Sequence, residues 1–158
     1  MVTLETEFLF EMRGTLGPPL DVGAGPEGVR NILPVAGGSA DGPAFKGEVV
    51  PGTCADWARI RPDGSFALDV RLVLKAENGD LIYMTYGGRI VAETEAGQAL
   101  ALDFGKTDPE TGADQYYFRI NPLFETGSET YAWLNKIVAV GTGMTGAGGV
   151  VYRIYKVK

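Results

Sequence analysis

The sequence predicts an all-β protein in which a single antiparallel sheet closes into a barrel of about eight to ten strands with little helix. Short segments alternate apolar and polar residues, as strands with one buried face do. Turn formers separate these segments, and the chain contains 23 glycines and 9 prolines. No window keeps an apolar period of about 3.6 residues over a helical length. A barrel is favoured over a sandwich because closure removes the sheet edges that promote aggregation.

Length and composition indicate one globular domain over residues 1–158. The chain is long enough to bury a core without disulfides. Hydrophobic residues make up 45% of it and charged residues 22%, which is ordinary for a folded domain. Short loops between consecutive strands favour a meander, in which sequence neighbours pair.

Charge and residue inventory exclude several kinds of site. The net charge of −6 and the absence of a Lys/Arg cluster argue against a nucleic-acid partner. With no histidine and one cysteine, neither a Ser-His-Asp triad nor a His/Cys zinc set is possible. No nucleotide-binding glycine loop occurs, so we predict no cofactor and no metal. The lone Cys54 fits a structural role in a reducing compartment.

The N-terminal region carries Glu5, Glu7 and Glu11 and has no basic stretch ahead of an apolar run, so it is not predicted to be a signal peptide. No segment approaches the ~20 apolar residues of a membrane-spanning helix. These features predict a cytoplasmic protein without a membrane partner.

The first predicted strand places Phe8, Phe10 and Met12 on one face and ends at Gly14. Residues 21–26 are predicted to form a Gly/Pro loop and residues 141–149 a glycine-rich loop. The clearest unit is a hairpin, because Asn78-Gly79 adopts the positive φ angles of a two-residue turn. The predicted strands span residues 4–13, 29–33, 45–50, 65–75, 81–90, 99–104, 116–121, 131–140 and 150–157.

Polar and aromatic side chains occupy alternate positions on several of these strands, so they share one face of each. We predict that these faces converge inside the barrel around one cavity. The alternative is that they face water, while rows such as Leu68, Val70, Leu72 and Leu74 form the core. The side chains concerned are Asp69, Arg71, Tyr83, Tyr117, Arg119, Tyr131, Trp133 and Asn135.

The chain also resembles a known family of uncharacterised proteins, the domain-of-unknown-function family numbered 3237. The resemblance rests on GGSADGPAFKGEVVPGTCADW (residues 37–57), LDVRLVL (68–74) followed by NGDLIY, YFR (117–119), and FETGSETYAWLN leading into VAVGTG. It implies a small calycin-like or streptavidin-like barrel that assembles into a homo-oligomer, and it supplies no function. The positions it carries over are Asp56, Trp57, Asp69, Arg71, Tyr83, Arg119, Glu125, Tyr131, Trp133 and Asn135.

Three functions fit these residues. The preferred one is an enzyme without a cofactor, an isomerase, cyclase or lyase that acts on an aromatic or apolar metabolite by general acid–base chemistry. The second is a carrier or sensor of a small hydrophobic ligand, and the third is a structural module whose ion pairs fix strand register. The predicted catalytic residues are Asp69, Glu125 and Arg119, and the predicted ligand-binding residues are Arg71, Tyr83, Tyr117, Tyr131, Trp133, Asn135 and Trp57.

Overall fold

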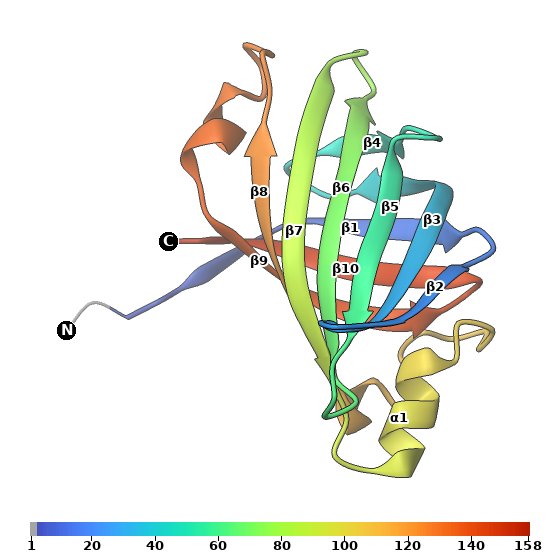
Figure 1. The fold of residues 1–158 in the computed structure, drawn as a ribbon. Coiled ribbons are helices and arrows are strands. Elements are labelled where there is room, and N and C mark those ends of the chain that lie inside the picture. The colour runs from blue at the N-terminus through green and yellow to red at the C-terminus, as the bar shows by residue number, and fades with distance from the viewer. Residues whose placement is uncertain (1–2) are drawn as a thin grey trace.

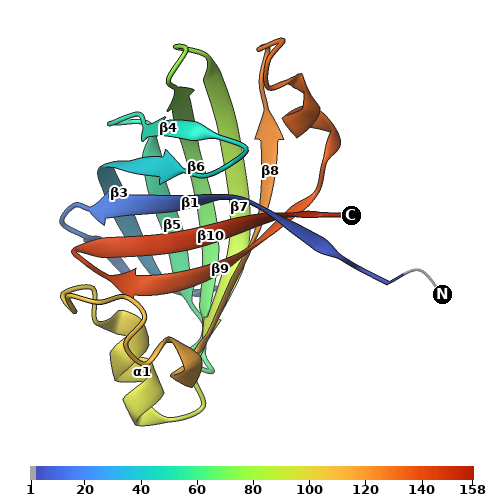
Figure 2. The same ribbon diagram turned by 180° about the vertical axis from the view of Figure 1, so that it is seen from behind.

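In the computed structural model, which describes residues 3–158, ten strands form one antiparallel sheet that closes into a barrel (Figures 1 and 2). The predicted all-β barrel with little helix is therefore confirmed. The elements are β1 (Thr6–Leu16), β2 (Leu20–Gly25), β3 (Gly28–Asp41), β4 (Lys46–Val49), β5 (Cys54–Ile60), β6 (Phe66–Ala76), β7 (Leu81–Val91), α1 (Glu95–Leu102), η1 (Ala113–Gln115), β8 (Tyr117–Glu125), η2 (Ala132–Lys136), β9 (Ala139–Gly146) and β10 (Gly149–Val157), where η marks a 3₁₀ helix.

The strands follow the predicted meander. Sequence neighbours from β6 to β10 pair with each other, and β1 closes the barrel by pairing with both β10 and β3. β4 and β5 share one position between β3 and β6, because β4 pairs with one half of each strand and β5 with the other. β2 pairs with β3 alone. Eight strand positions therefore close the barrel.

One end of the barrel interior is filled with aromatic and aliphatic side chains. The Phe10 ring lies 5.3 Å from Phe45 and 6.3 Å from Phe124, and Tyr131 packs on Phe45 from outside this cluster at 5.3 Å. Met84 is fully buried among these residues. This end of the interior is therefore packed with side chains in mutual contact.

The segment 99–104, predicted as a strand, is instead the end of α1 and the turn that follows it. The Thr94 side chain accepts a hydrogen bond from the Gly97 N–H at 3.0 Å and caps the helix. The alternating run ALALDF suggested a strand, but the cap and the tertiary packing favour a helix. Among residues 3–158, no helix has the length and apolarity needed to cross a bilayer.

The prediction of a strand over 131–140 and a loop over 141–149 was also wrong. Residues Ala132–Lys136 form η2, and the glycine-rich run forms β9. Glycine is required there because a Cβ at Gly143 would lie 2.6 Å from the Phe118 ring inside the barrel. Residues 21–26, predicted as a loop, belong largely to β2, and β5 was not among the predicted strands.

The strand pairing in the barrel wall is shortest between β8 and β9. These strands pair only at Arg119↔Thr142 and Ile120↔Gly141. Beyond that point β8 stays beside β7 and diverges from β9, and η2 lies in the connection between them (Figures 1 and 2). The outer surface is hollowed at this seam, as described below.

Candidate functional site

The end of the barrel nearer α1 keeps a small, partly open cavity of about 50 Å³. Its walls come from inward-facing side chains of seven strands, and Leu102 at the end of α1 and Phe104 just after it cover the cavity. Figure 1 shows α1 at this end of the barrel. Most of the lining side chains are aliphatic or aromatic. The polar groups among them are one carboxylate and two phenols. The lining residues are Leu16, Leu33, Val35, Asp56, Ala58, Phe66, Leu68, Val70, Tyr86, Ile90, Leu102, Phe104, Phe118, Val150 and Tyr152.

Asp56 is the acid of this cavity. It lies on β5 between buried Cys54 and Ala58, on the same inward face. Its Oδ1 accepts a hydrogen bond from the Asp69 N–H at 3.0 Å, at a point where the β5–β6 ladder is interrupted between Asp56↔Val70 and Arg59↔Ala67. Within residues 3–158, Oδ2 accepts no hydrogen bond, so it is free to meet a ligand or water.

The environment of Asp56 raises the pKa of its carboxyl group to about 6. Burial is the main cause, and the nearby Asp69 charge adds to it. The hydrogen bond from Asp69 and the Arg30 charge act in the opposite direction. Asp56 therefore exchanges a proton close to neutral pH, which is the property required of a general acid or base.

Tyr86 on β7 and Tyr152 on β10 face each other across the same space. Their ring centroids lie 5.4 Å apart in an edge-to-face arrangement, and Tyr152 makes a second such contact with Phe118. Burial is the main cause that raises the pKa of both hydroxyl groups, and the Asp56 charge raises both further. The contact between the two hydroxyl groups raises the pKa of Tyr86 and lowers that of Tyr152. Both phenols therefore stay neutral, and a ligand oxygen that accepts a hydrogen bond from them would compete with the contact between the two hydroxyl groups.

Cys54 should be unreactive in the folded protein. Burial raises the pKa of its thiol to about 12, with a further contribution from Asp56. Because the thiolate is the reacting species, alkylation by iodoacetamide at pH 8 is expected to be at least about 100-fold slower than for free cysteine. Mass spectrometry measures the rate, and unfolding in urea should restore it. Fast alkylation of the folded chain would contradict the structural role.

The predicted site residues on the strands lie on the outside of the barrel, so the predicted convergence inside is wrong. Asp69 and Arg71 form an exposed ion pair of 3.2 Å, and the Arg71 guanidinium lies 5.9 Å from the Trp57 ring. The row Leu68, Val70, Leu72 and Leu74 is buried, as the alternative held. Exposed Tyr83 stands opposite exposed Glu125 on the neighbouring strand. The catalytic and binding roles assigned to these residues remain predictions.

The remaining predicted residues fall into two further groups. Tyr117 and Arg119 lie together on the outer face of β8, with the guanidinium carbon 5.0 Å from the ring centroid. Tyr131 and Trp133 are partly buried and pack against the core from the η2 segment. Asn135 holds the turn before η2, because its side chain accepts from the Thr126 N–H and donates to the Thr126 carbonyl, both at 2.8 Å.

Tyr86 and Tyr152 were not among the predicted site residues. The alternation of side chains along the strands could have identified them. Tyr86 shares a strand face with the buried Ile82 and Met84, and Tyr152 shares one with the buried Ile154. A tyrosine on an apolar strand face marks a polar group inside a core. Asp56 was named through the family resemblance alone.

This arrangement defines a class of protein: a closed antiparallel barrel whose interior holds one proton-exchanging carboxylate and two neutral phenols. Within residues 3–158, no three His, Cys, Asp or Glu side chains gather as they would around a metal ion. The chain belongs to the DUF3237 family, described as "Protein of unknown function", whose model matches residues 4–157. The resemblance seen in the sequence is thereby confirmed.

Relatives of known sequence cover almost the whole chain. A UPF0311 protein of Rhodopseudomonas palustris strain TIE-1 is 31% identical over 155 residues, which are 98% of this chain and 97% of that protein. The chain is also similar to a protein named hydroalkoxylation enzyme phnH, from Penicillium herquei, with 27% identity over 136 residues, 86% of this chain and 72% of that protein.

Solved structures share the fold. The conserved protein of unknown function RPA1785 from Rhodopseudomonas palustris superimposes with a TM-score of 0.89 at 29% identity, and each chain is covered completely. An enzyme from Penicillium herquei superimposes with a TM-score of 0.72 at 21% identity, over 100% of this chain and 97% of that one. The second likeness shows the fold alone.

Proposed function

We propose that this protein is an enzyme without a cofactor that catalyses an intramolecular proton-transfer reaction, the cyclising addition of a hydroxyl group across an activated alkene. The observation that carries the proposal is Asp56, whose pKa is raised to about 6 inside an apolar cavity facing Tyr86 and Tyr152. The printed name of the distant relative phnH, a hydroalkoxylation enzyme, supports the same reaction class.

In the proposed mechanism Asp56 acts first as base and then as acid. Its carboxylate accepts the proton of the substrate hydroxyl while that oxygen forms a bond to the β-carbon of an enone. The π electrons move onto the carbonyl oxygen, giving an enolate that the Tyr86 and Tyr152 hydroxyls stabilise by hydrogen bonds. Protonated Asp56 then returns the proton to the α-carbon. Atoms and electrons balance without a metal or a redox partner.

Substrate entry requires movement of the α1 segment, because the cavity of about 50 Å³ is smaller than an aromatic enone. Leu102 and Phe104 close it, and hydrogen bonds tie their segment to the β9–β10 turn, with the Gly148 N–H donating to the Phe104 carbonyl at 2.8 Å. Short segments of this kind open on the microsecond-to-millisecond scale in many enzymes.

The test uses an ortho-hydroxyphenyl enone in heavy water, with ring closure followed by absorbance and deuterium at the α-carbon by mass spectrometry. Wild type is expected to accelerate closure and to deliver one deuterium stereoselectively, at a rate that rises as the pH passes about 6. Asp56→Asn should lower the rate at least about 100-fold, and Tyr152→Phe about 10-fold.

Asp69→Asn and Glu125→Gln serve as matched controls, since each neutralises an exposed carboxylate that the sequence had suggested as the base. Glu125→Gln should keep the wild-type rate at every pH. Asp69→Asn should keep the maximal rate but move the rise of the rate to a lower pH, because the Asp69 charge contributes to the raised pKa of Asp56. If the protein binds the enone but does not accelerate its closure, the carrier function is supported instead. If a control variant loses its maximal rate while Asp56→Asn keeps the wild-type rate, the assignment of Asp56 as the base is wrong.

A further inference from the structure

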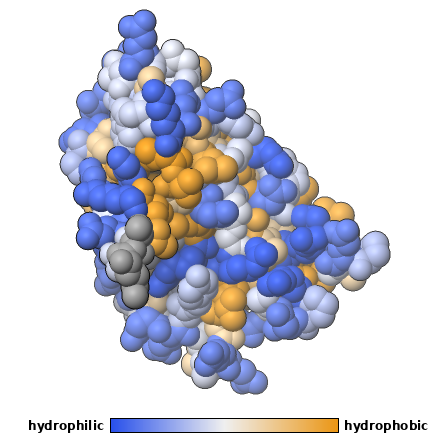
Figure 3. All heavy atoms as spheres, turned by 90° about the vertical axis from the view of Figure 1, so that its left-hand side faces the viewer, coloured by the Kyte–Doolittle hydropathy of each residue, from blue (hydrophilic) through white to orange (hydrophobic). Residues whose placement is uncertain are grey.

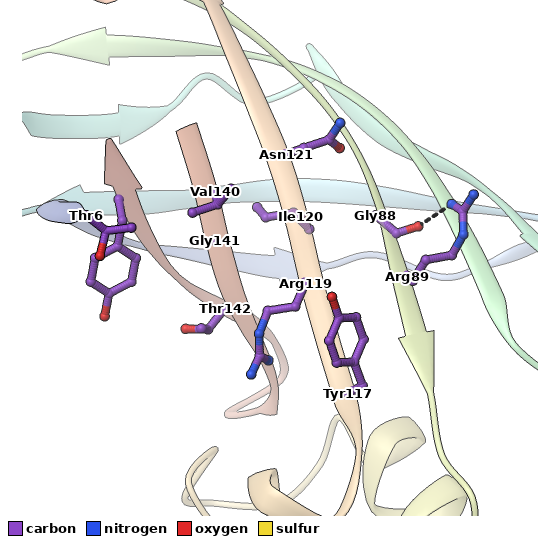
Figure 4. A pocket seen from close by; sticks show the side chains of 11 residues that line it. Thr6, Gly88, Arg89, Tyr117, Arg119, Ile120, Asn121, Val140, Gly141 and Thr142 are labelled. Carbon is purple, nitrogen blue, oxygen red and sulfur yellow. Dashed lines mark hydrogen bonds between the residues drawn. The ribbon is translucent and has the colours of Figure 1, made fainter. Parts of the chain in front are cut away.

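A second hollow, independent of the interior cavity, lies on the outer face at the β8–β9 seam. Its volume is about 750 Å³, and strands β7, β8 and β9 supply most of its lining (Figure 4). The polar side chains that line it are Arg89, Arg119, Asn121, Thr6, Thr142, Tyr117 and Tyr155. All of these side chains belong to the faces that point away from the interior, so the reaction proposed above makes no use of them. We call this hollow the outer groove.

Two arginines stand directly opposite one another in the outer groove. Arg89 on β7 pairs in register with Arg119 on β8. Like charges at directly opposed positions destabilise a sheet. Within residues 3–158, neither arginine has a carboxylate within ion-pair distance, although the chain carries a net charge of −6. The fold of the described residues therefore keeps two arginines at opposed strand positions without an anionic partner.

Most hydrogen-bonding capacity of these arginines is unused within the described chain. Arg89 donates one hydrogen bond, to the Gly88 carbonyl at 2.7 Å, and Arg119 donates one, to the Phe118 carbonyl at 2.8 Å. A guanidinium has five N–H donors, so most of them remain free on each side chain. Figure 4 shows the two guanidinium groups on opposite sides of Tyr117, with Arg119 directed toward Thr142.

The groove joins these cations to apolar surface. Ile120 and Val140 line it, and Leu123 and Val138, both more than half exposed, lie nearby on β8 and beside β9. Figure 3 shows an apolar area on this side of the molecule, bordered by hydrophilic atoms. A ligand with an anionic head and an apolar body would match both parts.

The charge nearby favours a singly charged head. A neighbouring hollow shares Tyr117 and Arg119 with the groove and is lined by Glu93 and Asp114. These carboxylates do not pair with Arg119, but they lower the local positive potential. A carboxylate is therefore a better match than a doubly charged phosphate, and the planar guanidinium of Arg119 suits its two oxygens.

We propose that the outer groove is a binding site for a small amphiphilic carboxylate, an aromatic or alkyl acid, with Arg119 as the main anion contact and Arg89, Tyr117 and Thr142 as its neighbours. The concave shape of the groove favours such a molecule over a second copy of the chain, whose docking requires a broad flat surface.

Calorimetric titration with benzoate tests the proposal, and NMR chemical-shift mapping locates the binding site. Benzyl alcohol, titrated in the same way, serves as the neutral analogue. Benzoate should bind wild type and shift Arg119 and Thr142 signals, while Tyr86 and Tyr152 signals stay in place. Arg119→Gln is expected to weaken binding at least about 10-fold, as is the change to benzyl alcohol. Inorganic phosphate should bind more weakly than benzoate.

The matched control is Arg59→Gln, which removes one positive charge outside the groove, at an arginine paired with Glu27. This variant should change benzoate affinity less than about two-fold, because Arg59 does not line the groove and salt screens the charge of an exposed side chain outside it. Equal affinity in Arg119→Gln and wild type, or no benzoate binding at all, would overturn the proposal. So would ultracentrifugation that finds a wild-type oligomer split by Arg119→Gln, because the arginines would then serve a second copy.

Discussion

Asp56→Asn should make the protein more stable above neutral pH, by about 2 kcal/mol in the free energy of unfolding at pH 8. The folded-state pKa of this carboxyl is raised to about 6, whereas an unfolded aspartate titrates near pH 4. The shift of about two units corresponds to about 3 kcal/mol, which we reduce because Asp56 is only partly buried.

The sign follows from which form the fold prefers. A raised pKa means that folding favours the protonated carboxyl, so its contribution to stability is fully present below about pH 4 and is lost as the pH rises through about 6. Asparagine imitates the protonated form and can still accept the hydrogen bond from the Asp69 N–H. Wild type and variant should therefore be equally stable at pH 4 and diverge above it.

Urea unfolding at several pH values measures this difference. The control is Asp114→Asn, which removes an exposed carboxylate and should not stabilise the protein at pH 8. A stability difference between Asp56→Asn and wild type that does not change with pH would remove the physical basis for the role of Asp56 in catalysis. A stabilised but inactive variant would show that the carboxylate is kept at a cost in stability, as functional groups often are.

Elements of this fold could be predicted where residues close in sequence determine them, and could not where residues of other strands do. The hairpin of β6 and β7 followed from a turn dipeptide and from alternation, both of which are local. β9 did not, because the space that a Cβ would need is taken by residues of other strands, by Phe118 at Gly143 and by Ile120 and Ile154 at Gly141. A glycine-rich run has no side chains to alternate, so its burial cannot be read from its own sequence.

The interior candidate site was not predicted from the sequence for a related reason. In a closed barrel both strand faces carry polar groups, and period-two alternation shows which residues share a face but not which face points inward. The density of charge favoured Asp69 and Arg119, yet charge accumulates where water is. The interior instead holds polar groups singly among apolar neighbours, as Tyr86 does between Met84 and Ile90, so these groups are the ones a count of charges overlooks.

Gly149→Ala should destabilise the protein by at least about 3 kcal/mol, because β1 is held in the barrel by unusually close backbone contacts on both sides. An added Cβ at Gly149 on β10 would overlap the Gly14 carbonyl oxygen, only 1.8 Å away. On the other side of β1, a Cβ at Gly38 on β3 would lie 1.9 Å from the Arg13 carbonyl oxygen. Backbone atoms cannot turn aside as a flexible side chain would.

These two contacts lie where β1 joins β10 and β3, the pairings that close the barrel. Urea unfolding compares Gly149→Ala with Gly127→Ala, whose added Cβ would meet nothing within 4 Å and should change stability by less than about 0.5 kcal/mol. Because Val150 and Tyr152 follow on the same strand and line the cavity, Gly149→Ala should also impair enone binding. Equal stability of the two variants would mean that β1 can shift outward, and that closure of the barrel tolerates a looser seam than the structure indicates.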